Sequence, residues 1–213
     1  FDGQLSLALE IFRGNYPKKF LHQLVSSQLD MDRLDYLNRD SFFTGVAEGV
    51  IGYDRIIKML SVRKNELVVE SKGMYSIEKF LISRRLMYWQ VYLHKTVLSA
   101  EEMLVKIIER AKEISSTRRL NATPSLSYFL ENNFLKGDFE KKPEILNRFA
   151  DLDDTDIISS IKMWRTDDDP ILAWLSTHLL ERKLFHIELR NTPFSEDEII
   201  SVRKKFLRLS NMP

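Results

Sequence analysis

Hydrophobic residues recur at intervals of three and four along most of the chain, and this spacing predicts a mainly helical protein. Glycine and proline are scarce, at 7 and 6 residues, so few positions interrupt a helix. Three short helices are expected before Gly45, over residues 5–12, 17–27 and 30–43. Neither glycine nor proline occurs from Tyr75 to Glu113. That segment predicts one long helix or two nearly continuous ones.

Two segments depart from the helical period. Residues 58–71 combine Leu67, Val68 and Val69 with the turn-like pair Lys64-Asn65, which predicts a short β-hairpin. Residues 185–189 (FHIEL) alternate between apolar and polar positions, which predicts a strand.

The polar segment 115–124 (SSTRRLNATP) predicts a domain boundary, with domains at residues 1–114 and 115–213. Helix-start signals follow it, among them the capping box Ser195 to Glu198. The acidic residues 151–156 and 167–169 are interpreted as helix caps, because a calcium loop would need a turn glycine and a terminal glutamate. Both Trp164 and Trp174 are expected in the core.

Composition narrows the function classes. The chain of 213 residues has 32 Lys and Arg against 31 Asp and Glu, so its net charge argues neither for nor against a polyanionic partner. Its short basic clusters are interpreted as solvated, and a nucleic-acid partner is therefore not expected. It has no cysteine, which excludes disulfides, thiol nucleophiles and zinc-thiolate sites. No apolar run reaches the roughly 20 residues of a membrane helix. With no basic-then-apolar leader after Phe1, these features predict a cytoplasmic protein without a membrane partner.

The segment from Gln28 to Gly45, QLDMDRLDYLNRDSFFTG, carries a dense group of carboxylate, guanidinium and phenol side chains. At about 100° per residue, its polar residues occupy an arc of about 140°. These residues are Asp32, Asp35, Tyr36, Arg39 and Asp40, with Arg33 at the edge. A solvated face with ion pairs would explain the spacing alone. Carboxylates beside guanidinium groups also suit a hard cation with phosphates.

This segment resembles the one that carries the last metal-binding aspartate of HD-domain deoxynucleoside triphosphate (dNTP) triphosphohydrolases. A second block, SRRLMYWQVYLHK at residues 83–95, resembles the long substrate-facing helix of the same family. The resemblance covers roughly residues 1–113. It implies a mainly α protein: an HD-domain helical bundle with a short β-hairpin, followed by a smaller α+β C-terminal subdomain.

The resemblance also implies roles for single residues, although it identifies no catalytic residue in this chain. Asp32 matches the metal-binding aspartate. The matches to substrate-binding positions are Arg33, Tyr36 and Arg84 at the phosphates, Asp40 at the sugar 3′-hydroxyl, and Tyr92 packed on the deoxyribose. His94 and Lys95 match positions that touch an activating nucleotide in some relatives. Asp35 is expected to be a structural partner of Arg39.

The implied reaction is the attack of water on the α-phosphorus of a dNTP, giving a deoxynucleoside and inorganic triphosphate. It implies a divalent cofactor, Mg²⁺, Mn²⁺ or another transition metal, and a homodimer or homotetramer. No His-Asp pair occurs in the chain. The other metal ligands are therefore expected upstream of Phe1, and the chain alone is expected to be inactive. The alternatives are another HD-type nucleotide phosphohydrolase and an inactive nucleotide-sensing or interaction module.

Overall fold

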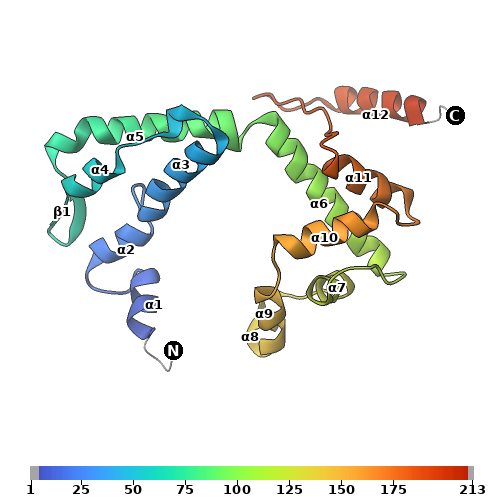
Figure 1. The fold of residues 1–213 in the computed structure, drawn as a ribbon, viewed down its shortest axis with the longest axis horizontal. Helices are drawn as coiled ribbons and strands as arrows, with labels where there is room; N and C mark the ends of the chain where they lie inside the picture. The colour runs from blue at the N-terminus through green and yellow to red at the C-terminus, as the bar shows by residue number, and fades with distance from the viewer. Residues whose placement is uncertain (1–4, 211–213) are drawn as a thin grey trace. The chain divides into compact units, whose positions relative to one another are not determined.

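The computed structural model describes residues 5–210, with side chains through Phe206. Two compact units make up the chain, residues 1–98 and 99–213 (Figure 1). The boundary between them along the chain falls within a helix, Lys95–Ser115. The domain division expected between residues 114 and 115 stays a prediction. No helix in the described residues has both the length and the apolar composition that crossing a membrane requires.

The first unit is helical, with one small sheet. Its elements are α1 (Ser6–Phe12), α2 (Lys19–Val25), α3 (Met31–Thr44), η1 (Ala47–Gly49), α4 (Tyr53–Met59), β1 (Leu60–Arg63), β2 (Glu66–Val69), η2 (Ser71–Gly73), α5 (Met74–Met87) and η3 (Tyr88–Tyr92). The helix starts and ends expected from the sequence are confirmed within a few residues. Gly45 ends α3 with φ of 72°, a left-handed conformation that glycine adopts without steric cost.

The predicted β-hairpin is confirmed. Strands β1 and β2 pair antiparallel, with Leu60 opposite Val69 and Arg63 opposite Glu66. Lys64 and Asn65 form the turn with φ of 49° and 69°. Positive φ at both central residues is typical of the tight turns that match the twist of a two-stranded ribbon.

The core of the first unit lies where α3 packs on α5 (Figure 1). Its buried hydrophobic residues are Leu34, Leu37, Ile51, Ile56, Phe80 and Met87. Leu34 and Leu37 lie on the face of α3 opposite to the polar arc, so burial of this face turns the carboxylates outward. The packing of α3 on α5 therefore positions the polar residues of both segments.

Gly49 lies buried between these two helices. A Cβ atom added there would lie 2.9 Å from Cβ of Ser41 on α3 and 2.6 Å from Sδ of Met87 on α5. The hydroxyl of Ser41 donates to the carbonyl of Val46 at 2.6 Å, so Ser41 cannot move aside without breaking this hydrogen bond.

We expect Gly49→Ala to lower the free energy of unfolding by about 1–3 kcal/mol, the usual cost of overpacking a core. Urea denaturation would measure it. Gly52→Ala is the matched control, because no described heavy atom outside its chain neighbours lies within 4 Å of a Cβ at that position. Equal stability of the two variants would contradict the close packing of Gly49 against Ser41 of α3 and Met87 of α5.

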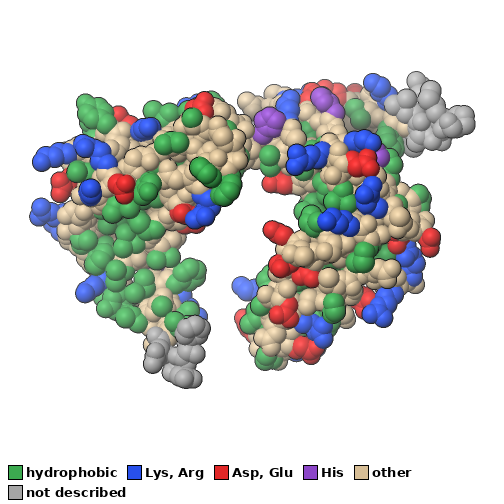
Figure 2. All heavy atoms as spheres, in the orientation of Figure 1, with side chains coloured by type: hydrophobic (Ala, Val, Ile, Leu, Met, Phe, Trp, Pro, Cys, Tyr) green, Lys and Arg blue, Asp and Glu red, His purple; other side chains and the backbone are tan. Residues whose placement is uncertain are grey.

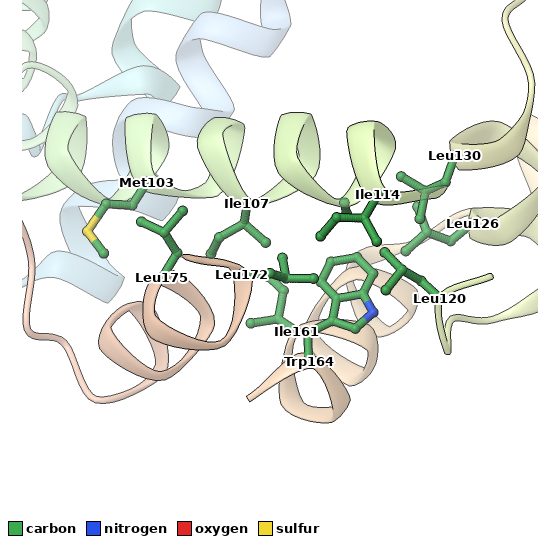
Figure 3. Close-up of a cluster of buried hydrophobic side chains, with 11 residues drawn as sticks. Met103, Ile107, Ile114, Leu120, Leu126, Leu130, Ile161, Trp164, Leu172 and Leu175 are labelled. Atoms are coloured by element: carbon green, nitrogen blue, oxygen red, sulfur yellow. The ribbon is translucent and has the colours of Figure 1, made fainter. Parts of the chain in front are cut away.

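The second unit is helical throughout its described residues. Its elements are α6 (Lys95–Ser115), which begins in the first unit, α7 (Pro124–Glu131), α8 (Lys136–Lys141), α9 (Pro143–Ala150), α10 (Asp154–Trp164), α11 (Pro170–Leu180) and α12 (Glu196–Ser210). A core of buried side chains from α6, α7, α10 and α11 surrounds Trp164 (Figure 3). The capping interpretation is confirmed at Asp153, Asp169 and Ser195.

Two expectations for the second unit are wrong. Residues 185–189 form no strand, because the described part of this unit offers no partner strand, and the carbonyl of Phe185 instead accepts from the hydroxyl of Ser99 at 2.7 Å. Trp174 is 45 % exposed, whereas Trp164 is 1 % exposed. Helix α11 is apolar on most sides, so its sequence does not reveal that Leu172 and Leu175 face the core while Trp174 faces outward.

Asp169 joins α11 to α6. Its carboxylate accepts from the backbone N–H of Leu172 at 2.8 Å, and from Arg110 Nε at 3.2 Å and Nη2 at 2.5 Å. The Arg110 guanidinium, which donates to the carboxylate, holds the pKa of Asp169 below its usual value. The ionised form is therefore favoured in the folded protein.

Because this pKa is depressed by folding, the stabilisation is complete above the unfolded pKa of about 4 and is lost as the pH falls through the lower folded value. We expect Asp169→Asn to lower the free energy of unfolding at pH 7, and the difference from the wild type to shrink at pH 3. Denaturant titrations at both pH values measure this. A difference that stays constant between them would contradict a stabilising role for the Asp169 charge.

Candidate functional site

One groove in the first unit is lined by polar and aromatic residues of α3, α5 and η3. We call it the polar groove, and its volume is about 390 Å³. It is lined by Asp32, Arg33, Tyr36, Asp40, Arg84, Tyr88 and Tyr92. All six residues that the sequence indicated for metal and substrate binding thus line one surface, and Tyr88 joins them.

Helix α3 turns its acidic residues to two different sides. Asp32 lies in the first turn, where the partial positive charge of a helix N-terminus favours a carboxylate. Asp35 lines a larger apolar groove on the other flank of α3, together with Arg39, Phe42 and Phe43. Arg39 donates to Asp35 through Nε at 2.9 Å and Nη2 at 3.0 Å, which confirms the expected structural pair.

The segment η3 is a π-helix, in which the N–H of Leu93 donates to the carbonyl of Tyr88 at 2.7 Å. Such turns occur frequently at functional sites. The sequence predicted a regular α-helix here and did not indicate this turn. With it, the rings of Tyr88 and Tyr92 pack edge to face at 5.2 Å, and Tyr36 packs against Tyr92 at 6.0 Å.

Tyr92 and Asp40 are hydrogen-bonded across the groove. The phenol of Tyr92 donates to Oδ2 of Asp40 at 2.6 Å, over a sequence separation of 52 residues. Burial raises the pKa of Tyr92, and the hydrogen bond to the Asp40 carboxylate raises it further. Tyr92 is therefore a neutral hydrogen-bond donor near pH 7.

The two arginines of the groove differ in their surroundings. Arg33 forms an ion pair with the buried Asp30, and its Nη1 also donates to the carbonyl of Ser27 at 2.7 Å. Arg84 donates to Oε1 of Gln28 at 3.3 Å, and its guanidinium lies 5.8 Å from the centre of the Tyr88 ring. No carboxylate in the described chain forms a salt bridge with Arg84, which leaves its charge available for an anion.

Burial raises the pKa of Tyr36, and the positive charges of Arg84 and Arg33 act in the opposite direction. Tyr36 is therefore also protonated near pH 7. The groove thus presents two cations and three phenols beside the carboxylates of Asp32 and Asp40, and the O–H of Tyr92 is donated to Asp40. Groups of these kinds can bind phosphate oxygens on one side and a hydroxyl group on the other.

His94 and Lys95 follow η3 and do not line the polar groove. Both are exposed, and Nδ1 of His94 accepts from the backbone N–H of Thr96 at 3.3 Å. An unbroken α-helix from Arg84 onward would place Lys95 on the same face as Arg84. The π-turn changes the angular phase of the residues that follow it. An effector role for either residue stays a prediction.

A divalent cation needs several oxygen or nitrogen ligands. Within residues 5–210 no three His, Asp or Glu side chains gather into a group that could hold one. Asp32 offers one exposed carboxylate, while Asp40 is already bonded to Tyr92. Asp32 can therefore supply one ligand, and the described residues do not complete a metal site.

Arg84, Tyr88 and Tyr92 of the groove lie in a segment that matches a known protein family. Residues 51–124 match the HD associated region. The whole chain is similar to 53 % of a crystallised phosphohydrolase from Bacteroides thetaiotaomicron, with 51 % sequence identity and a TM-score of 0.94. The predicted mainly α architecture, an HD-like phosphohydrolase fold with a two-stranded sheet, is thereby confirmed.

Curated relatives extend the comparison. The uncharacterised protein YwfO of Bacillus subtilis is 34 % identical over 83 % of this chain and 39 % of its own length. A protein of Dictyostelium discoideum named as a deoxynucleoside triphosphate triphosphohydrolase SAMHD1 homolog is 24 % identical over 60 % of this chain and 26 % of its own length. The chain therefore spans less than half of the length of the curated relatives it matches.

Two residues of the site were not among the predicted site residues. Tyr88 lines the polar groove; the helical period places it on the face of Arg84 and Tyr92, but no role was expected for it. Asp30 holds Arg33, and an aspartate at a helix start three residues before an arginine could have indicated that contact.

Proposed function

We propose that this chain acts within a longer protein and contributes the nucleotide-binding face of an HD-type phosphohydrolase. Its substrates are dNTPs, and its products are a deoxynucleoside and inorganic triphosphate. The observation that carries the proposal is the polar groove, where two guanidinium groups lie beside a hydrogen-bonded carboxylate and phenol. The name of the Dictyostelium relative and that of the Bacteroides phosphohydrolase support the same class of chemistry.

In this proposal the positive end of the groove binds the triphosphate. Arg84, which lacks a carboxylate partner among the described residues, and Arg33 donate to phosphate oxygens, and the Tyr36 phenol adds a neutral donor. Guanidinium groups suit this role because their planar donors match the spacing of phosphate oxygens. Their charges also stabilise the negative charge that the leaving triphosphate carries.

Asp40 and Tyr92 face the sugar. The carboxylate of Asp40 accepts from the 3′-hydroxyl while it still accepts from Tyr92, because a carboxylate has four acceptor sites. The Tyr92 ring packs against the deoxyribose and excludes a 2′-hydroxyl. Two rings contact Tyr92, those of Tyr36 and Tyr88, so it cannot swing away to admit a ribonucleotide without losing both contacts.

Asp32 supplies one ligand to a divalent metal ion, whose remaining ligands come from outside the described residues. The bound metal would lower the pKa of the attacking water and polarise a phosphoryl oxygen. The chain's own residues orient the substrate so that its α-phosphorus faces Asp32. The protein is proposed to be a cytoplasmic dimer or tetramer, and His94 and Lys95 are proposed contacts for an activating nucleotide.

Product analysis tests the proposal. The intact protein would be incubated with each dNTP and with each ribonucleotide in the presence of Mg²⁺ or Mn²⁺, and the products separated by ion-exchange chromatography. Deoxynucleoside plus triphosphate, with ribonucleotides hydrolysed far more slowly, is the expected result. Residues 1–213 alone serve as the control and are expected to be inactive.

Two other outcomes correspond to other functions. Release of single phosphates, or opening of a diester, would identify a different HD-type nucleotide phosphohydrolase. Tight dNTP binding without any product would identify a sensing or interaction module. Absence of both binding and turnover in the intact protein would refute a nucleotide site in the polar groove.

A further inference from the structure

Asp30, the residue that caps the N-terminus of α3, is buried with 2 % of its surface exposed, and it does not itself line the polar groove. Both of its oxygen atoms accept hydrogen bonds. Oδ1 accepts from the backbone N–H of Arg33 at 2.8 Å, and Oδ2 accepts from the backbone N–H of Ser27 at 3.2 Å and from Nη1 of Arg33. One side chain thus caps α3 and holds the guanidinium of Arg33.

Arg33 is held from two sides by groups of the α2–α3 connection. Its Nη1 donates to Asp30 and also to the carbonyl of Ser27 at 2.7 Å. Both contacts use Nη1, so Nε and Nη2 keep their donors for the groove. The Arg33 side chain is 28 % exposed, which leaves part of it accessible to a ligand.

We infer that Asp30 is a positioning residue, which holds the Arg33 guanidinium in the orientation that binds the substrate phosphates. This inference rests on the proposed function and deepens it. A free arginine side chain loses much rotamer freedom when it binds a ligand, and a side chain that is already fixed loses less. Asp30 fixes Arg33 before the substrate arrives, so the binding of a triphosphate carries a smaller entropic cost.

The charge of Asp30 has an opposing effect, because a carboxylate beside Arg33 weakens its attraction for phosphate. The geometry favours the positioning effect. A buried pair with two further hydrogen bonds is held in one orientation, so loss of Asp30 would free the guanidinium that binds the phosphates. The direction of the change in KM separates the two effects, because loss of the negative charge alone would lower KM, whereas loss of positioning would raise it.

The test is a double-mutant cycle in the intact protein with Asp30→Asn and Arg33→Ala. Asparagine is as good a helix cap as aspartate, so this change keeps α3 and removes the ion pair. We expect Asp30→Asn to raise the KM for a dNTP about tenfold at 0.15 M salt, the effect of one charge-assisted hydrogen bond, with a smaller change in kcat. In the Arg33→Ala background the same change should have no effect.

Asp35→Asn is the matched control, because Asp35 forms an ion pair on the same helix but lines the opposite groove. It should leave KM unchanged. An equal rise in KM in both Arg33 backgrounds would show that Asp30 acts only through the fold, and no rise in the wild-type background would show that it does not position Arg33. Either result overturns the inference.

The positioning role of Asp30 can also be tested if the proposed hydrolysis of dNTPs is wrong. If the wild-type protein does not hydrolyse any dNTP, the same four proteins would be titrated with inorganic triphosphate, and the dissociation constant would replace KM. A tenfold loss of affinity that requires Arg33 would then support the positioning role without hydrolysis. Equal affinities across the four proteins would overturn it.

Discussion

Replacing Asp32 with alanine in the intact protein is expected to lower dNTP turnover on the order of a hundredfold or more, while dNTP affinity changes much less. The proposed role of Asp32 is to hold a metal ion, which supplies several kcal/mol of transition-state stabilisation, equivalent to about two or three powers of ten in rate. Arg33, Tyr36 and Arg84 would still contact the phosphates. Steady-state kinetics gives kcat, and nucleotide binding is measured separately by calorimetry.

Asp35→Ala is the control for this experiment. Asp35 lies one turn after Asp32 on α3, but it pairs with Arg39 on the other flank of the helix. Loss of that exposed pair should cost little. The metal content of the purified proteins provides a readout that does not depend on activity, and only Asp32→Ala should lower it. Equal activity of the wild type and Asp32→Ala would refute the metal-ligand role.

Replacing Trp164 with alanine is expected to lower the free energy of unfolding by about 3–5 kcal/mol, the usual cost of removing a large aromatic side chain from a core. Trp164 is 1 % exposed and lies among the buried side chains of the second unit (Figure 3). Its indole N–H also donates to the carbonyl of Asn121 at 2.8 Å. The change therefore leaves both a cavity and an unpaired carbonyl. Urea denaturation of residues 1–213, followed by far-UV circular dichroism, measures the loss.

Trp174→Ala provides a matched comparison in the same unit. Trp174 is 45 % exposed and stacks on His178, with ring centres 3.7 Å apart. Removing an exposed stacked ring is expected to cost about 1 kcal/mol. If both tryptophan variants lost equal stability, the assignment of Trp164 to the core and of Trp174 to the surface would be wrong.

The surface of both units carries many hydrophobic side chains (Figure 2). In the first unit, Phe42 and Phe43 at the end of α3 are 81 % and 78 % exposed, and their rings pack only edge to face on each other at 5.3 Å. Adjacent exposed aromatic rings often mark a contact with another segment, and the described residues do not cover these two. This observation agrees with the proposal that the chain acts within a longer protein.

Local signals in the sequence were sufficient to predict the helices and the hairpin. Gly45 ends α3 because glycine adopts the left-handed backbone conformation at the lowest steric cost. Helices start at Asp153, Asp169 and Ser195 because the side-chain oxygen atoms of these residues accept from free backbone N–H groups. Each of these effects acts between residues a few positions apart. The polar arc of α3 was predictable for the same reason, because the helical period alone fixes which residues share a face.

Contacts between distant residues required the tertiary structure. The pairing of Tyr92 with Asp40 depends on how α3 packs on α5. The π-turn that follows α5 carries Tyr88 and Tyr92, which line the groove, whereas Lys95 does not line it. The failed strand at residues 185–189 and the exposed Trp174 have the same origin, because a ladder partner and a buried face are supplied by other segments. The helical period places a side chain on a face, and only the packing of other segments decides what that face contacts.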